Sequence, residues 1–239
     1  MTTSAYNQAN APKPGHPNVL HEEIDCLTSR LQREAVLAVE LVEQAVTALR
    51  NCDKESASDV RRRDTEVDEE EVRIEEECIR LIALHQPVAR DLRALMIVIK
   101  ANGDIERIAD HASGVAKAVS YLGDEAPPTW PTSLIELAER TIPLCHDTVR
   151  ALGQRDEASA RAIINGDDII DRLTREVVEE VEESIGAGSL TRRAGLLAFR
   201  ASRDLERIGD LCANICEDIL YVRTGKIVRH AKRLSAEQG

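Results

Sequence analysis

Two short segments of the sequence are rich in carboxylates and nearly repeat one another. The first, DIERIAD, runs from Asp104 to Asp110, and the second, DLERIGD, runs from Asp204 to Asp210, one hundred residues later. Each copy carries three acidic side chains within seven residues, in a setting otherwise rich in Ala, Val, Ile and Leu. Clustered carboxylates are the ligands that hard cations prefer, so the repeat predicts a pair of cation sites in a duplicated protein.

On a helix, the glutamate and the last aspartate of each motif share one face. Residues four apart lie about 40° from one another around the axis, so Glu106 and Asp110 are neighbours. Ile99, seven residues before Glu106, lies on the same helix face, and the matching face in the second copy carries Phe199 and Leu196. Because these upstream positions are apolar, the pattern predicts that the carboxylates face other helices rather than open water.

A second segment in each half carries a matching acidic pair. Fifteen residues separate Asp53 from Asp68 in the first half, and the same number separates Asp156 from Asp171 in the second. Each half thus offers two helices that carry a DxxxD or ExxxD pair. The candidate metal ligands are Asp64, Asp68, Glu106, Asp110, Asp167, Asp171, Glu206 and Asp210.

The carboxylates need a source of positive charge. Like charges four residues apart destabilise a helix by about 0.2–0.5 kcal/mol, and buried carboxylates cost several kcal/mol more. Arg107 lies three residues from both Asp104 and Asp110, and Arg207 repeats this arrangement beside Asp204. An arginine network therefore explains the first aspartate of each motif, but the glutamate points about 100° away from that arginine. Metal sites, salt-bridged seams between helices and solvated faces all remain open.

The donor set restricts the metal and the chemistry. All-oxygen ligands suit hard cations such as Mg²⁺, Mn²⁺, Ca²⁺ or iron, and zinc is less favoured without His or Cys. A di-iron enzyme needs Glu-x-x-His motifs, whereas each glutamate here has an aspartate four residues on. A carboxylate-bridged metalloenzyme, such as a phosphatase or oxidase, remains an alternative, and so does a structural bundle without metal.

Composition and charge narrow the class of protein. The chain is 43% hydrophobic but only 2% aromatic, and its net charge is −12, which together argue against nucleic-acid binding. No apolar run approaches the roughly 20 residues needed to cross a bilayer, so we expect a cytoplasmic protein. The six cysteines form no CxxC pair, which favours free thiols.

Apolar residues recur at three and four positions along almost the whole chain, which predicts an all-α protein of two tandem, similar three-helix bundles. The expected helices cover about 20–51, 53–85, 88–122, 133–153, 156–185 and 190–224, with Asp53, Thr132 or Ser133, and Ser189 as N-caps, and with Pro143 as a point where the fourth can bend. The expected domains are a disordered tail (1–18), a first bundle (19–123), a linker (124–132), a second bundle (133–225) and a C-terminal tail (226–239).

The stretch QPVARDLR has no counterpart in the second half. It reads as a turn between helices, in which Pro87 starts a helix and Asp91 favours its N-terminus. Since it departs from the repeat, it is also a candidate partner surface. The residues concerned are Gln86, Pro87, Arg90, Asp91 and Arg93.

The sequence resembles the PhoU family of phosphate signalling proteins. The segments that carry the resemblance are HQPVARDLR, then DIERIADHA, and DLERIGDLCANICEDILYVRTGKIVRH near the C-terminus. The resemblance implies two three-helix bundles whose E(D)xxxD motifs hold multinuclear metal clusters, of iron, Mn, Mg or Zn, on a concave bundle surface. It divides the eight candidate ligands into a first site (Asp64, Asp68, Glu106 and Asp110) and a second site (Asp167, Asp171, Glu206 and Asp210).

The two copies differ beyond the shared motif. In the second copy, Asn214 and Glu217 extend the acidic stripe and are candidate additional ligands. The first copy has Lys117 where the second has Glu217, which places a positive charge on the matching stripe. We therefore expect the first site to be weaker or to hold fewer ions.

The resemblance also implies a function. Proteins of this family are negative regulators of the phosphate-starvation response and maintain phosphate homeostasis. They link the ATPase subunit of the phosphate ABC transporter to the phosphate-sensing histidine kinase, and they often form homodimers. The expected protein is a signalling adaptor rather than an enzyme, which reaches the membrane only through its partners.

Overall fold

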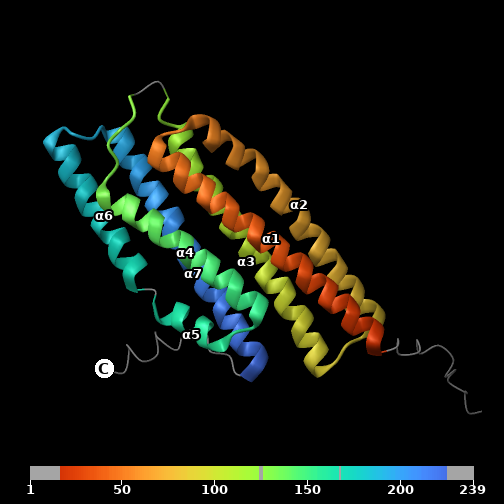
Figure 1. Ribbon diagram of the computed structural model, residues 1–239. Helices are drawn as coiled ribbons and strands as arrows, with labels where there is room; N and C mark the ends of the chain where they lie inside the picture. Colours follow the sequence, from red (N-terminus) through yellow and green to blue (C-terminus); the bar gives the residue numbers. More distant parts are fainter. Residues whose placement is uncertain (1–16, 124–125, 167, 225–239) are drawn as a thin grey trace, which may run out of the picture.

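The computed structural model describes residues 17–123, 126–166 and 168–224, and in these ranges the chain forms helices and no strand (Figure 1). The helices are α1 (Pro17–Asn51), α2 (Lys54–His85), α3 (Ala89–Ser120), α4 (Thr132–Gln154), α5 (Glu157–Asn165), α6 (Asp168–Ala187) and α7 (Arg192–Thr224). The expected all-α class with two similar helical bundles is confirmed.

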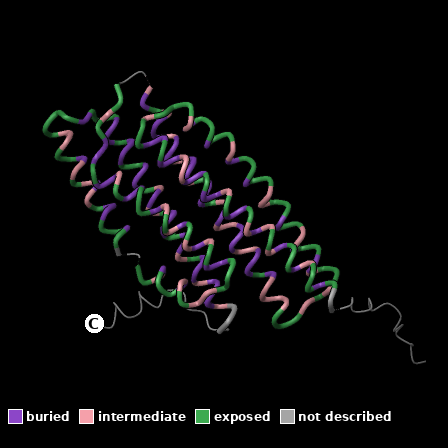
Figure 2. Tube along the Cα trace, in the orientation of Figure 1, coloured by how far each residue is buried: buried purple, intermediate pink, exposed green. Residues whose placement is uncertain are grey.

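The two bundles pack against each other along their length. Helices α1, α2 and α3 form the first bundle, and α4 to α7 form the second. Contacts between α3 and α7 and between α1 and α4 join the halves, so α2 and α6 lie on opposite flanks (Figure 1). One hydrophobic cluster runs through both halves, and Figure 2 shows the buried positions on the sides of the helices that face each other.

The spacing of apolar residues explains how α2 packs. Its buried face carries Ala57, Val60, Val67, Ile74, Cys78 and Leu81 at intervals of three, four and seven residues. Asp64 occupies a position in this stripe where every other buried residue is apolar. At the N-terminus, the side chain of Asp53 accepts hydrogen bonds from the N–H groups of Glu55 and Ser56, which confirms the predicted N-cap.

The cap of α4 comes from another helix. The carboxylate of Glu180 on α6 accepts hydrogen bonds from the N–H groups of Thr132 (2.7 Å) and Ser133 (3.0 Å). The cap position itself is Pro131, whose side chain offers no acceptor. The prediction that Thr132 or Ser133 caps this helix is therefore wrong, because α6 supplies the acceptor.

The N-terminus of α7 also differs from the prediction. The hydroxyl of Thr191 accepts a hydrogen bond from the N–H of Ala194 (3.1 Å), so Thr191 takes the place expected for Ser189. The Ser189 hydroxyl instead donates to the carbonyl of Ser184 (3.1 Å), at the end of the preceding helix.

The predicted helix 156–185 is two helices. Asp156 caps α5, which ends at Asn165, and Gly166 donates its N–H to the carbonyl of Ile163 in a tighter final turn. Glycine has poor helix propensity, so Gly166 accounts for the break that the apolar periodicity hides. Helix α4, in contrast, continues through Pro143.

Several predictions fall outside the described residues or are untested. The predicted tails lie outside them, except that Pro17 and Asn18 already belong to α1. The domain boundaries remain predictions.

The six cysteines are free thiols, as expected. Within the described ranges, none of the helices combines the length and apolar character that crossing a bilayer requires.

Candidate metal centre

The structure places the four predicted ligands of the first site on two neighbouring helices. Asp64 and Asp68 lie on α2 and the other two on α3, which packs along α2. Burial first, and then the charge of Asp110, raise the pKa of Asp64 to about 6. Burial likewise raises the pKa of Glu106 to about 7, reinforced by Asp110 and Asp68. These mutual effects show that the four carboxylates share one electrostatic environment.

The four side chains differ in exposure. Asp64 is buried, with 9% of its surface exposed, and Glu106 is half-buried. Asp68 and Asp110 are exposed. The prediction that these carboxylates face other helices therefore holds for Asp64 and in part for Glu106, while the other two line an open rim.

The donor set of the first site fits a hard cation. Oδ1 of Asp64 is buried and has no hydrogen-bond partner among the described residues, although the carboxylate also bonds to Ser113. An ion bound here would satisfy this oxygen and reduce the repulsion between the carboxylates. Within the described residues, no three His, Cys, Asp or Glu side chains converge closely enough to hold a metal as they stand. The exposed Asp68 and Asp110 would have to turn inward to complete a site.

The sequence analysis missed one acidic neighbour of this site. Burial raises the pKa of Glu71, and the charges of Glu75 and Asp68 add to the effect. Glu71 lies seven residues after Asp64 and three after Asp68, so the same helical periodicity could have identified it.

The second site is only partly described. Asp167 lies outside the described residues, and Asp171 is exposed on α6. Burial raises the pKa of Asp210 on α7, with contributions from Glu206 and Asp171. These three carboxylates therefore influence one another electrostatically, but their role as metal ligands stays a prediction, and Glu206 also forms an ion pair with Arg203 on the preceding turn.

The apolar line predicted upstream of the second motif does not face other helices. Phe199 is 40% exposed and Leu196 is 61% exposed, whereas the matching Ile99 on α3 is partly buried. The prediction that this face of α7 packs against other helices is therefore wrong. An apolar stripe is buried only where another helix covers it.

The arginines pair differently in the two halves. Arg107 forms an ion pair with Asp104 (3.4 Å), as the arginine interpretation predicted. Asp204, in contrast, lies 3.0 Å from Nδ1 of His111 on α3. The surface pair expected between Asp204 and Arg207 is thus replaced by a contact between the two bundles.

The two sites differ in the charged residues beside them, which affects how tightly each would bind a metal. Lys117 is close enough to lower the pKa of Asp64, as its position on the stripe predicts. Along α7, Asn214 is exposed and Glu217 is half-buried, and their role as additional ligands stays a prediction. Even with Lys117 nearby, burial and then the neighbouring carboxylates raise the pKa values of Asp64, Asp68 and Glu106, so these three groups hold a proton more tightly than ordinary carboxyl groups do.

The predicted partner surface forms the turn between α2 and α3. Gln86 and Arg90 are exposed, while Pro87, Asp91 and Arg93 are half-buried. Asp91 lies in the first turn of α3, as expected, and pairs with His21 of α1 (3.3 Å). The same turn exposes Val88 (75%) and Leu84 (57%), which adds apolar area to it. Its role in binding a partner stays a prediction.

Comparison with known proteins shows that one family model matches both halves of the chain. The family model described as the PhoU domain matches residues 31–119 and again residues 134–219. Among curated proteins, the chain is 37% identical over 195 residues to a phosphate-specific transport system accessory protein PhoU of Serratia marcescens, covering 80% of each chain. It is 32% identical over 209 residues to the protein of that name from Escherichia coli K12, covering 87% of this chain and 86% of the relative.

Two solved structures resemble the fold. The phosphate transport system regulatory protein PhoU from Streptococcus pneumoniae superposes with a TM-score of 0.80 at 27% identity, over 87% of this chain and 99% of that one. PhoU from Pseudomonas aeruginosa gives a TM-score of 0.79 at 31% identity, over 87% of this chain and 100% of that one.

Proposed function

The chain belongs to the PhoU family, and on this premise we propose that it is a negative regulator of the phosphate-starvation response. The observation that carries the proposal is that similarity extends over both repeats and most of the length of relatives named as accessory proteins of phosphate-specific transport. A solved relative is described as a regulatory protein of the same transport system. The chain would act as an accessory and regulatory component of that system.

The finer part of the proposal concerns partners. The chain would couple the ATPase subunit of the phosphate ABC transporter to the phosphate-sensing histidine kinase, on the cytoplasmic side where both present their soluble parts. The exposed turn at Gln86 and Arg90, with Val88 and Leu84 beside it, offers the mixed polar and apolar surface that a protein partner can cover. A homodimer would present two such turns.

We also propose that metal at the carboxylate sites is structural or regulatory rather than catalytic. The support is the donor set: Asp64, Asp68, Glu106 and Asp110 bring only oxygen atoms, and His111 beside them is held by Asp204. We expect the first site to bind metal more weakly or to hold fewer ions, because the positive charge of Lys117 lies near Asp64. Purified protein that turns over a phosphate ester with metal, and loses this activity in Asp110→Asn, would show an enzyme instead.

The test of regulation is genetic. Deletion in the source organism should switch on phosphate-starvation genes at high phosphate, and the intact chain should restore repression. Genes that stay silent after deletion would contradict the proposal. The partner assignment is tested by pull-down with the ATPase subunit and with the cytoplasmic part of the kinase, comparing the intact chain with Arg90→Glu and, as a control on another exposed turn, Arg155→Glu.

A further inference from the structure

We propose that the first metal site continues inward to a cation subsite formed by Glu34 of α1 and Asn102 of α3, which takes a hard divalent cation through oxygen ligands. The inference rests on the proposed metal at the first site, because the inner subsite lies one helical turn from Glu106 and shares that residue with the outer carboxylates. It adds a helix, α1, that carries none of the repeated acidic motifs.

Glu34 is a charged residue in an apolar position. It lies on α1 between Leu31 and Ala38, both of which are buried in the core. Only 2% of its surface is exposed, and both carboxylate oxygens lack a hydrogen-bond partner among the described residues. Buried charged groups are rarely left unpaired, so a carboxylate in this condition points to a partner that protein atoms do not supply.

Asn102 presents a third buried oxygen of the same kind. Its side chain has no exposed surface, and Nδ2 donates a hydrogen bond to the backbone carbonyl of Glu71 (2.9 Å). Because the carbonyl can only accept, this bond fixes which end of the amide is the nitrogen. Oδ1 is left without a partner among the described residues.

The register of the helices brings these oxygens to one level. On either side of Glu34 along α1, Arg30 pairs with Glu70 of α2 (2.9 Å) and Glu40 pairs with Arg63 of α2 (3.1 Å). Glu34 is therefore level with the part of α2 between Arg63 and Glu70. Asn102 bonds to the residue after Glu70, which places it within about one helical turn of the level of Glu34.

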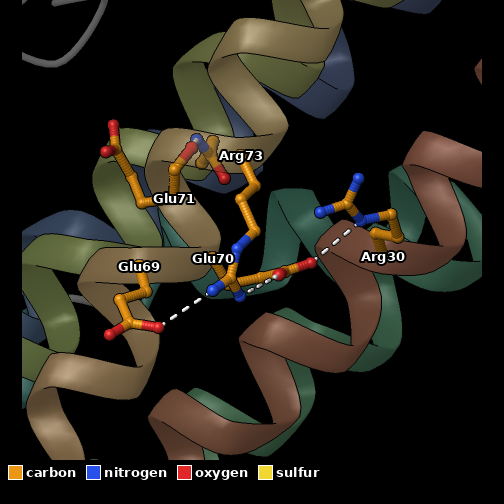
Figure 3. Close-up of polar contacts among 6 residues, drawn as sticks. Arg30, Glu69, Glu70, Glu71 and Arg73 are labelled. Atoms are coloured by element: carbon orange, nitrogen blue, oxygen red, sulfur yellow. Dashed lines mark hydrogen bonds and ion pairs between the residues drawn. The ribbon is translucent and has the colours of Figure 1, made fainter.

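The nearest arginines are engaged elsewhere. Figure 3 shows Glu70 reaching across to Arg30, with Arg73 between Glu69 and Glu70, while Glu71 points away from this network. Burial first, and then the charges of Glu70, Glu71 and Glu106, raise the pKa of Glu34 to about 8, while Arg30, the weakest of these influences, lowers it. The arginines therefore neutralise Glu70, whereas Glu34 has no arginine of its own among the described residues.

A divalent cation satisfies all three oxygens at once. Glu34 and Asn102 supply carboxylate and amide oxygens, which are ordinary ligands of Mg²⁺ and Mn²⁺. Glu106, half-buried and one turn beyond Asn102, connects this level to the exposed Asp68 and Asp110, so an ion can enter from the rim. Two other arrangements would leave the oxygens without metal: a protonated Glu34 that donates to Asn102, or a buried water between them.

The test uses Mn²⁺ as the probe and the full chain freed of metal with chelator. The bound Mn²⁺ is counted after equilibrium dialysis, and the rise in thermal unfolding temperature on adding Mn²⁺ is measured in parallel. Glu34→Gln keeps the shape of the side chain and removes its charge. Glu40→Gln makes the same change at an exposed position six residues further along α1, and it is the matched control.

Under the proposal, Glu34→Gln binds about one Mn²⁺ fewer per chain, or binds its tightest ion at least about tenfold more weakly, and its unfolding temperature rises less with Mn²⁺. Glu40→Gln behaves as the intact chain. Equal Mn²⁺ content and equal thermal shifts in Glu34→Gln and Glu40→Gln would overturn the inner subsite in favour of a proton or a water.

A third variant separates this inference from the outer site. Asp68→Asn with Asp110→Asn removes charge only at the rim. If this double variant loses Mn²⁺ while Glu34→Gln does not, the outer site stands and the inner subsite fails. If the intact chain itself binds no Mn²⁺, the metal part of the proposed function fails together with the subsite. Far-UV circular dichroism at each step establishes that the variants are folded.

Discussion

Nδ1 of His111 on α3 lies 3.0 Å from the carboxylate of Asp204 on α7, so a polar contact joins the two bundles at the helices that pack most extensively. Gly114, one turn after His111, makes room for it. A Cβ atom at this position would come within 2.5 Å of Oδ2 of Asp204. The close approach of α3 and α7 therefore depends on a glycine in one repeat and an aspartate in the other.

Replacing Gly114 tests this approach. Gly114→Ala should destabilise the chain by about 1–3 kcal/mol, because the added methyl displaces Asp204 from His111. Gly103→Ala on the same helix is the control, since a Cβ there meets nothing within 4 Å. It should stabilise the chain by about 0.5–1 kcal/mol through helix propensity. Urea unfolding measures both, and shifts of the same sign would contradict this reading of the contact.

The cap that α6 supplies to α4 gives a second prediction. Glu180→Ala should cost about 1–2 kcal/mol of unfolding free energy at pH 7, because two N–H groups and the positive end of α4 lose their acceptor. Glu179→Ala, at an exposed position on the same helix, should have little effect. Chemical unfolding of both variants checks this, and equal losses would argue against the cap.

The same carboxylate makes the effect depend on pH. Burial alone would raise the pKa of Glu180, but hydrogen bonds from Ser133 and Thr132 outweigh it and hold the pKa below its ordinary value of 4.5. A lowered folded pKa contributes stability that is present above pH 4.5 and is lost as the pH falls through the folded value. The gap between the intact chain and Glu180→Ala should therefore close in acid, and a gap that stays constant from pH 7 to pH 3 would disprove this.

The buried Glu34 predicts the opposite dependence in the metal-free chain. Its pKa is raised from 4.5 to about 8, so the folded state binds the proton more tightly than the unfolded state. Stability is then highest below pH 4.5 for this group and falls as the pH rises towards 8. Glu34→Gln cannot ionise, so with chelator present it should become more stable than the intact chain by a few kcal/mol between pH 5 and pH 8. A difference that does not grow with pH would rule this out.

Thiol reactivity provides a fifth prediction. Cys26 is exposed and Cys52 is half-buried, whereas the others are buried. Burial raises the pKa of both Cys78 and Cys216 to about 12, which leaves almost no reactive thiolate at neutral pH. A thiol reagent should label Cys26 rapidly and the buried thiols only after unfolding, so Cys26→Ser should remove the fast phase. Rapid labelling of the buried thiols would indicate a more open core.

Much of the fold and of the first site could be predicted because the signals are local. Apolar spacing places the helices, Asp53 has the type and position of an N-cap, and the carboxylates four residues apart share a face wherever the chain is helical. The break at Gly166 was missed because a single glycine is a weak signal within a strong apolar pattern.

The amino-acid sequence by itself determined the duplicated helical plan and the acidic faces, since both follow from the geometry of one helix. Only the tertiary structure decided which partner each charge receives. It placed Glu180 at the start of α4 and His111 beside Asp204, and it buried the carboxylate of Glu34 without a hydrogen-bond partner among the described residues. These relationships join residues far apart in the chain, so they depend on how helices cross, and the spacing within one helix does not contain that information.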